Sequence, residues 1–146
     1  MTTAQQDPGS SIFFRLTIDG LDLGLFNSCE GLAAEVEVQQ WEEGGNNGHV
    51  WQLPTRVRHS TIRLSRPLTH ETAKVTSWIS SIATGIRRPT AQIVALRADG
   101  SQVAQWGLLE VLPVRWQGPS LDPASPAVAT ETLEITHHGF TDAGAA

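Results

Sequence analysis

Polar and apolar residues alternate along three segments of this 146-residue chain, at residues 32–41, 56–66 and 128–138. Such a period of two is typical of strands with one buried and one wet face. If the first two segments pair, Glu35 and Glu37 become cross-strand partners of Arg63. The polar positions of the three segments are Glu35, Glu37, Gln39, Thr61, Arg63, Thr130, Thr132, Glu134 and Thr136.

Further strands are expected at residues 13–18, 21–25, 91–96 and 102–116, with Pro113 interrupting the last of them. The pairs Asp19-Gly20 and Asp99-Gly100 supply turns. The pattern predicts one helix of about four turns at ~3.6 residues per turn, capped by Thr69 and ended by Gly85. Its apolar stripe consists of Val75, Trp78, Ile79 and Ile82.

These elements indicate a mainly β protein in which two antiparallel sheets pack as a sandwich or barrel, with one flanking helix. The length suits a single domain spanning residues 1–146, with loosely held ends at 1–11 and 141–146. Wet faces on so many strands are also what the wall of a water-filled channel needs.

A long glycine-rich loop separates the first two alternating segments. Its glycines and asparagines give backbone freedom, while its tryptophans and aliphatic residues are costly to leave in water and argue against disorder. We therefore predict an arm that becomes ordered against another subunit. We expect its two acids to meet an arginine of a neighbour, namely Arg56, Arg58 or Arg66. The loop contains Trp41, Glu42, Glu43, Gly44, Gly45, Asn46, Asn47, Gly48, His49, Val50, Trp51, Gln52, Leu53 and Pro54.

Composition narrows the function classes. The net charge is −5, so broad attraction to nucleic acid is not expected. The first ten residues show no secretory signal, and no apolar run is long enough for a membrane helix. The single cysteine, Cys29, excludes an internal disulfide framework and is expected to be a small buried residue.

No catalytic, metal-binding or cofactor-binding pattern stands out. The loop glycines are not followed by the Gly-Lys-Ser/Thr of a phosphate-binding loop. His137 and His138 are adjacent, so in a strand they point to opposite faces and cannot easily share one ion. We therefore expect neither an enzyme nor a cofactor.

Taken together, several short segments resemble the tail-tube family of contractile phage tails and extracellular contractile injection systems. The loop segment is the most distinctive, and the order and spacing of the pieces over residues 13–139 make the match specific. The segments are FRLTIDG at 14–20, LGLF at 23–26, SCEGL at 28–32, EEGGNN at 42–47, LP at 53–54, IRLSR at 62–66, WI at 78–79, GPSLD at 118–122 and ETLEITHHG at 131–139.

The resemblance implies hexameric rings that stack into a hollow tube inside a contractile sheath. It implies that residues 32–41, 56–66, 105–116 and 128–138 line the lumen, and that the loop contacts neighbouring subunits. Glu35, Glu37 and Glu134 would then make the wall acidic and repellent to polyanions. The implied partners are sheath, baseplate and cap proteins, with cargo or DNA in the lumen and no stable membrane insertion. Such a particle is assembled in the bacterial cytoplasm, and it can be released outside the cell.

Other interpretations remain open at this point. A tube-initiating baseplate protein or the ring protein of type VI secretion would share these features. A monomeric β-sandwich that binds carbohydrate through its tryptophans is a further alternative.

Overall fold

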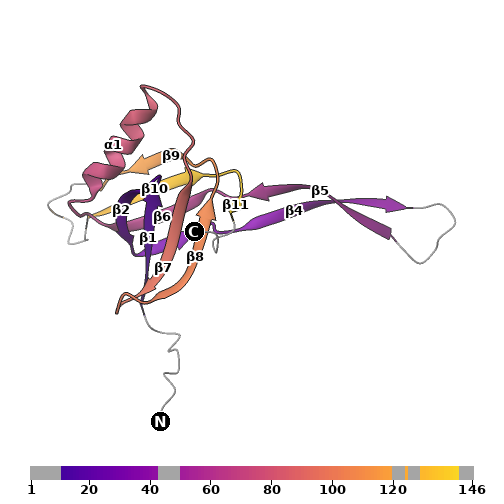
Figure 1. Ribbon diagram of the computed structural model, residues 1–146, viewed down its shortest axis with the longest axis horizontal. Coiled ribbons are helices and arrows are strands. Elements are labelled where there is room, and N and C mark those ends of the chain that lie inside the picture. The colour runs from indigo at the N-terminus through magenta and orange to yellow at the C-terminus, as the bar shows by residue number, and fades with distance from the viewer. Residues whose placement is uncertain (1–10, 43–49, 120–123, 125–128, 142–146) are drawn as a thin grey trace, which may run out of the picture.

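A computed structural model of the protein describes residues 11–42, 50–119, 124 and 129–141. Within these ranges the chain forms eleven strands and one helix (Figure 1). The elements are β1 (Ile12–Ile18), β2 (Leu21–Phe26), β3 (Ser28–Glu30), β4 (Ala34–Glu42), β5 (Val50–His59), β6 (Ile62–Pro67), α1 (Thr72–Ile82), β7 (Ala91–Arg97), β8 (Gln102–Leu108), β9 (Leu112–Gln117), β10 (Thr130–Thr136) and β11 (Phe140–Thr141).

The strands form two antiparallel sheets and one separate hairpin. The five-stranded sheet has the order β11-β8-β7-β1-β2, and the four-stranded sheet has the order β3-β6-β10-β9. Strands β4 and β5 pair only with each other and project from the rest of the molecule, which we call the body (Figure 1). The predicted class, a mainly β fold of two packed sheets with one helix, is therefore confirmed.

The core lies between the two sheets and is closed by one face of α1. Val75 and Trp78 of the helix are buried, as the predicted stripe requires. The other buried apolar residues are Leu16, Ile18, Leu23, Phe26, Ile62, Leu64, Ala91, Ile93, Ala95, Leu108, Val111, Leu133 and Ile135. In β6, β7 and β10 they come from alternate positions, so the period of two located this part of the core correctly. Leu23 and Phe26 of β2 are three positions apart, and Val111 lies just before β9.

The first predicted hairpin is present and shows why its turn residues were informative. Asp19 and Gly20 both have positive φ, at 47° and 82°, as a two-residue hairpin turn of the primed type requires. This turn places Ile18 opposite Leu21.

Three predicted elements differ from the observed ones. Residues 56–66 are not one strand, because the chain leaves the hairpin after His59 and enters the four-stranded sheet at Ile62. The break within residues 102–116 falls between Leu108 and Leu112, and Pro113 lies inside edge strand β9, where its missing N–H is tolerated. The helix has 11 residues, about three turns, and the Thr69 hydroxyl accepts a hydrogen bond from Glu71 N–H just before it begins.

Gly31 packs against Thr61, which lies in the break between β5 and β6, and this contact gives a first prediction. Its φ is +93°, and a Cβ there would lie 2.1 Å from the Thr61 carbonyl oxygen. Gly31→Ala should therefore lower the free energy of unfolding by more than about 1 kcal/mol, measured by urea unfolding. Gly20→Ala is the control, because its φ is +82° with no atom within 4 Å of the added Cβ. Equal losses for both variants would show that the close approach to Thr61 has no energetic weight.

Candidate functional site

The β4–β5 hairpin is an arm without support from its own body. Neither strand makes extensive contacts with another described element. An isolated two-stranded hairpin is at best marginally stable in water. Yet the arm exposes Trp41 by 55% and Trp51 by 54%, and these two residues lie opposite each other. The arm therefore presents a surface that a second molecule can cover.

The two faces of the arm differ in chemistry. One face is aliphatic over much of its length and contains the paired residues Val36 and Val57. The other face is charged at its root and aromatic towards its tip. The exposed apolar residues of the arm are Val36, Val38, Trp41, Val50, Trp51, Leu53 and Val57.

The charges at the arm root are paired within the chain. Glu37 lies 3.4 Å from Arg56 Nε and 2.5 Å from Arg58 Nη2. Glu35 stands opposite Arg58 in the register. The predicted pairing of Glu35 and Glu37 with Arg63 is therefore wrong, because Arg63 belongs to another sheet.

The loop acids were expected to meet one of three arginines. Glu43 and the side chain of Glu42 lie outside the described residues, as do residues 44–49. Arg56 and Arg58 have Glu37 as a partner in their own chain, and their pairing with a neighbour's loop stays a prediction. Arg66 cannot serve, because it is only 2% exposed.

Arg66 is instead the centre of a buried ion pair between the sheets. Its Nε lies 2.7 Å from Glu131 Oε1, and its Nη1 donates to the Leu23 carbonyl oxygen at 2.6 Å. The guanidinium also lies 4.2 Å above the Phe26 ring. Glu131 is fully buried. The contacts of Arg66 with Glu131 and with the Leu23 carbonyl oxygen join β2 to the four-stranded sheet. Because both charged side chains are buried, neither contributes to the charge of the surface.

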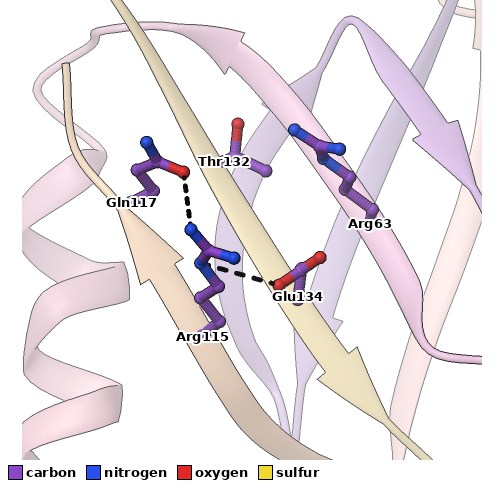
Figure 2. Close-up of a pocket in the computed structure, with 5 residues that line it drawn as sticks. All are labelled: Arg63, Arg115, Gln117, Thr132 and Glu134. Atoms are coloured by element: carbon purple, nitrogen blue, oxygen red, sulfur yellow. Dashed lines mark hydrogen bonds and ion pairs between the residues drawn. The ribbon is translucent and has the colours of Figure 1, made fainter. Parts of the chain in front are cut away.

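The outer face of the four-stranded sheet gathers most of the other predicted polar residues (Figure 2). Two rows cross the strands: Arg63 (β6), Glu134 (β10) and Arg115 (β9) in one, and Ser65, Thr132 and Gln117 in the next. Arg115 Nη2 donates to Gln117 Oε1 at 3.2 Å, and its Nε lies 3.9 Å from Glu134. A shallow cavity of about 110 Å³ lies between Arg63, Arg115, Gln117, Thr132 and Glu134.

This polar face has a different charge from the one expected. Glu30 of β3 stands opposite Arg63, so the charged row alternates in sign from Glu30 through Arg63 and Glu134 to Arg115. Thr61, Thr130 and Thr136 flank it, whereas Glu35, Glu37 and Gln39 lie on the arm. This face is therefore mixed in charge rather than acidic, and the acidic lumen wall stays a prediction. Arg115 lies in the expected segment 105–116 but was not named as a site residue, and Gln117 lies just beyond that segment. Their alternation with Val114 and Trp116 in the sequence was a usable signal.

The remaining candidates for reactive or metal-binding groups are Cys29 and the adjacent histidines. Burial, with a smaller contribution from Glu30, raises the pKa of the Cys29 thiol to about 11, so it stays protonated at neutral pH. No group of three or more potential metal ligands occurs in the part of the chain that the structure describes. His137 is buried and His138 is exposed, so the two rings do not share one site, although both residues lie after β10 and not within a strand as the sequence argument assumed.

The membrane expectation concerns helices alone. None of the helical residues that the structure describes forms a segment long and apolar enough to cross a membrane.

The fold places the protein among mainly β proteins in which two antiparallel sheets and one helix form a body from which a hairpin projects. The particular family follows from the sequence match: residues 10–141 match the model of the T4-like virus tail tube protein gp19, and the chain belongs to this family. It is a tail tube subunit of a contractile phage tail or an extracellular contractile injection system, and it has a structural role rather than an enzymatic one.

Solved structures support the same fold. A chain in the 6-fold symmetrised baseplate of the anti-feeding prophage is 25% identical with a TM-score of 0.73, over 97% of this chain and 96% of that one. A chain in the sheath–tube complex of the extracellular contractile injection system PVC is 18% identical with a TM-score of 0.76, over 97% of both chains. A chain in the tube-terminating cap of the anti-feeding prophage has a TM-score of 0.75 at 18% identity, over 97% and 93%. No match was found among curated protein sequences.

Proposed function

We propose that this subunit closes into hexameric rings that stack into a hollow tube, and that the arm joins neighbouring subunits. The observation that carries the proposal is the exposure of the paired Trp41 and Trp51 on a hairpin that no other described element covers. Burying a large apolar side chain is worth about 1.5–3 kcal/mol. Covering the arm on an adjacent subunit therefore stabilises both the arm and the assembly.

The polar face of the four-stranded sheet is the part we assign to the lumen. Its edge strands, β3 and β9, have one unpaired backbone edge each within the described chain. Pairing such edges between subunits satisfies their backbone groups and makes a wall without lateral edges. Because the charged row alternates in sign, the wall has little net charge and holds neither polyanions nor polycations strongly.

The same proposal extends to partners and location. The similar chains come from sheath–tube, baseplate and cap structures. We therefore infer that this tube binds a sheath outside and ends at a baseplate and a cap, and that the lumen passes cargo or DNA. The subunits assemble in the bacterial cytoplasm, and residues 1–146 act as one tail-tube domain. A carbohydrate-binding module no longer fits, because the chain belongs to a structural family.

A tube-initiating baseplate protein is the second candidate, and the similarity to a chain in a baseplate structure favours considering it. The two candidates differ in the length of the assembly. An initiator forms a single ring, whereas a tube subunit forms a stack of many rings, since its heterologous contacts repeat along the axis.

Deleting residues 44–50 tests the proposal. We expect the wild-type protein to form hollow rods in negative-stain micrographs. The shortened protein should remain folded by circular dichroism but form no rods, because its arm no longer reaches the adjacent ring. Normal rods from the shortened protein would contradict the role of the arm, and a wild type that stays monomeric at high concentration would contradict the tube itself.

A further inference from the structure

Three aromatic rings meet where the arm joins the body. His59 is the last residue of β5, His137 follows β10, and Phe140 begins β11. The ring centroids of His59 and His137 are 4.9 Å apart, those of His137 and Phe140 are 5.0 Å apart, and those of His59 and Phe140 are 5.5 Å apart. The rest of the arm has no extensive contact with the other described elements, so this cluster packs the root of the arm against the body beside its covalent connections at residues 31–33 and 60–61.

The cluster is built for uncharged imidazoles. Nδ1 of His59 and Nε2 of His137 are buried and make no hydrogen bond to the described residues. Nδ1 of His137 lies 3.2 Å from Gly139 N, which donates to the neutral ring, and 3.3 Å from the Gly139 carbonyl oxygen, which accepts from a protonated Nδ1. Burial is the largest cause of the lowered pKa of His137, whose ordinary value is 6.5. The Gly139 carbonyl oxygen raises this pKa, and the charges of His59 and His138 lower it.

The charged groups near the cluster contact His138 and do not act as counter-ions for His137. Glu110 is the nearby acid, and it pairs with His138 on the exposed side. Arg88 reaches the same ring, with its Nη1 3.3 Å from His138 Nε2. A proton on His137 would therefore meet the imidazole of His59 about 5 Å away and no free carboxylate among these neighbours.

We propose that the contact between His59 and His137 is a pH-sensitive latch that holds the root of the arm against the body while the His137 ring is neutral and releases it when that ring is protonated. Because the unfolded or released state binds the proton more tightly, the stabilisation is complete above pH 6.5. It is lost as the pH falls from 6.5 towards the lowered folded-state pKa of His137. Each unit of pH within this window weakens the latch by about tenfold.

Two measurements on the full chain test the latch. The first is an NMR titration of the histidine rings in unassembled wild-type protein, in which we expect His137 to titrate below exposed histidines. The second is hydrogen exchange of the β4 and β5 amides at pH 7.5 and pH 5.0, corrected for intrinsic rates, in which we expect about tenfold faster exchange in the arm at pH 5.0 and little change in the body. Neither measurement depends on tube formation, although the effect of the latch on assembly rests on the proposed function.

Variants separate the latch from general acid sensitivity. His137→Phe keeps an aromatic ring without a titrating group, so exchange in its arm should become nearly independent of pH between 7.5 and 5.0. His70→Phe is the matched control, because the His70 side chain is 92% exposed and lies between β6 and α1, outside the arm and the cluster, and it should behave like wild type. If His137→Phe fails to fold, the wild-type titration decides alone. An ordinary pKa for His137, or the same pH dependence in wild type and His137→Phe, would overturn the proposal.

Discussion

Replacing Arg66 by alanine is expected to lower the free energy of unfolding of the isolated subunit by about 3–5 kcal/mol. The variant leaves the Glu131 carboxylate fully buried with no cation, and it also removes the donor to the Leu23 carbonyl oxygen. An uncompensated buried charge is among the most destabilising results of a single substitution. Urea unfolding monitored by tryptophan fluorescence measures the loss.

Arg63 provides the matched control for this prediction. It lies on the same strand, three residues earlier, but its side chain is on the exposed polar face. Arg63→Ala should change the free energy of unfolding by less than about 0.5 kcal/mol. A loss for Arg66→Ala no greater than that of Arg63→Ala would show that the buried pair has no role in stability.

A double variant examines why the loss occurs. Arg66→Met with Glu131→Leu removes both charges and keeps apolar volume, and we expect it to be much more stable than either single variant. A double loss equal to the sum of the single losses would mean that the two side chains act independently, contrary to their 2.7 Å contact.

The buried pair also shows how far the sequence could be interpreted. Arg66 follows Ile62 and Leu64 at intervals of two, and Glu131 precedes Leu133 and Ile135 in the same way. Both charges therefore lie on apolar strand faces, and the pairing of β6 with β10 places them opposite each other. Alternation alone located each residue, but the partnership depends on a register between segments 65 residues apart. That register is set by tertiary packing, which local patterns do not encode.

The separation of β5 from β6 was missed for a related reason. Alternation continues from Arg56 to Arg66 with no strong turn signal, and the break occurs at Ser60 and Thr61. The change of direction is favoured by Gly31, whose lack of a side chain lets another strand's backbone approach closely. Because this contact joins distant parts of the chain, the sequence predicted the strands and the exposed arm residues but gave Glu35 and Glu37 the wrong cross-strand partner, Arg63.

The separation of the arm from the body also explains how one chain can combine a stable core with an apolar surface that a second subunit covers. The body has its own core and its own buried ion pair, so its stability does not require the arm. The arm consequently can keep apolar residues exposed until a second subunit covers them. Substitutions on the arm should therefore affect assembly while leaving the unfolding of the body almost unchanged, which is the opposite of the expectation for Arg66.

The double variant Trp41→Ala with Trp51→Ala makes this expectation quantitative. Losing the burial of two large apolar side chains per subunit costs about 3–6 kcal/mol, if each contributes about 1.5–3 kcal/mol. Since 1.4 kcal/mol is a factor of ten, the concentration needed for tube formation should rise by at least roughly 100-fold. Sedimentation of assembled material over a dilution series measures this shift, and thermal unfolding of the unassembled subunit should change little.

Gln40 and Gln52 supply the control, because they form the neighbouring cross-strand pair and are also exposed, but on the opposite face of the arm. Gln40→Ala with Gln52→Ala removes side-chain atoms at the same distance from the body without removing aromatic area. It should assemble within a few fold of the wild-type concentration. If the two double variants assemble alike, or if the tryptophan variant assembles at the wild-type concentration, then the aromatic face of the arm does not contribute to the contact between subunits.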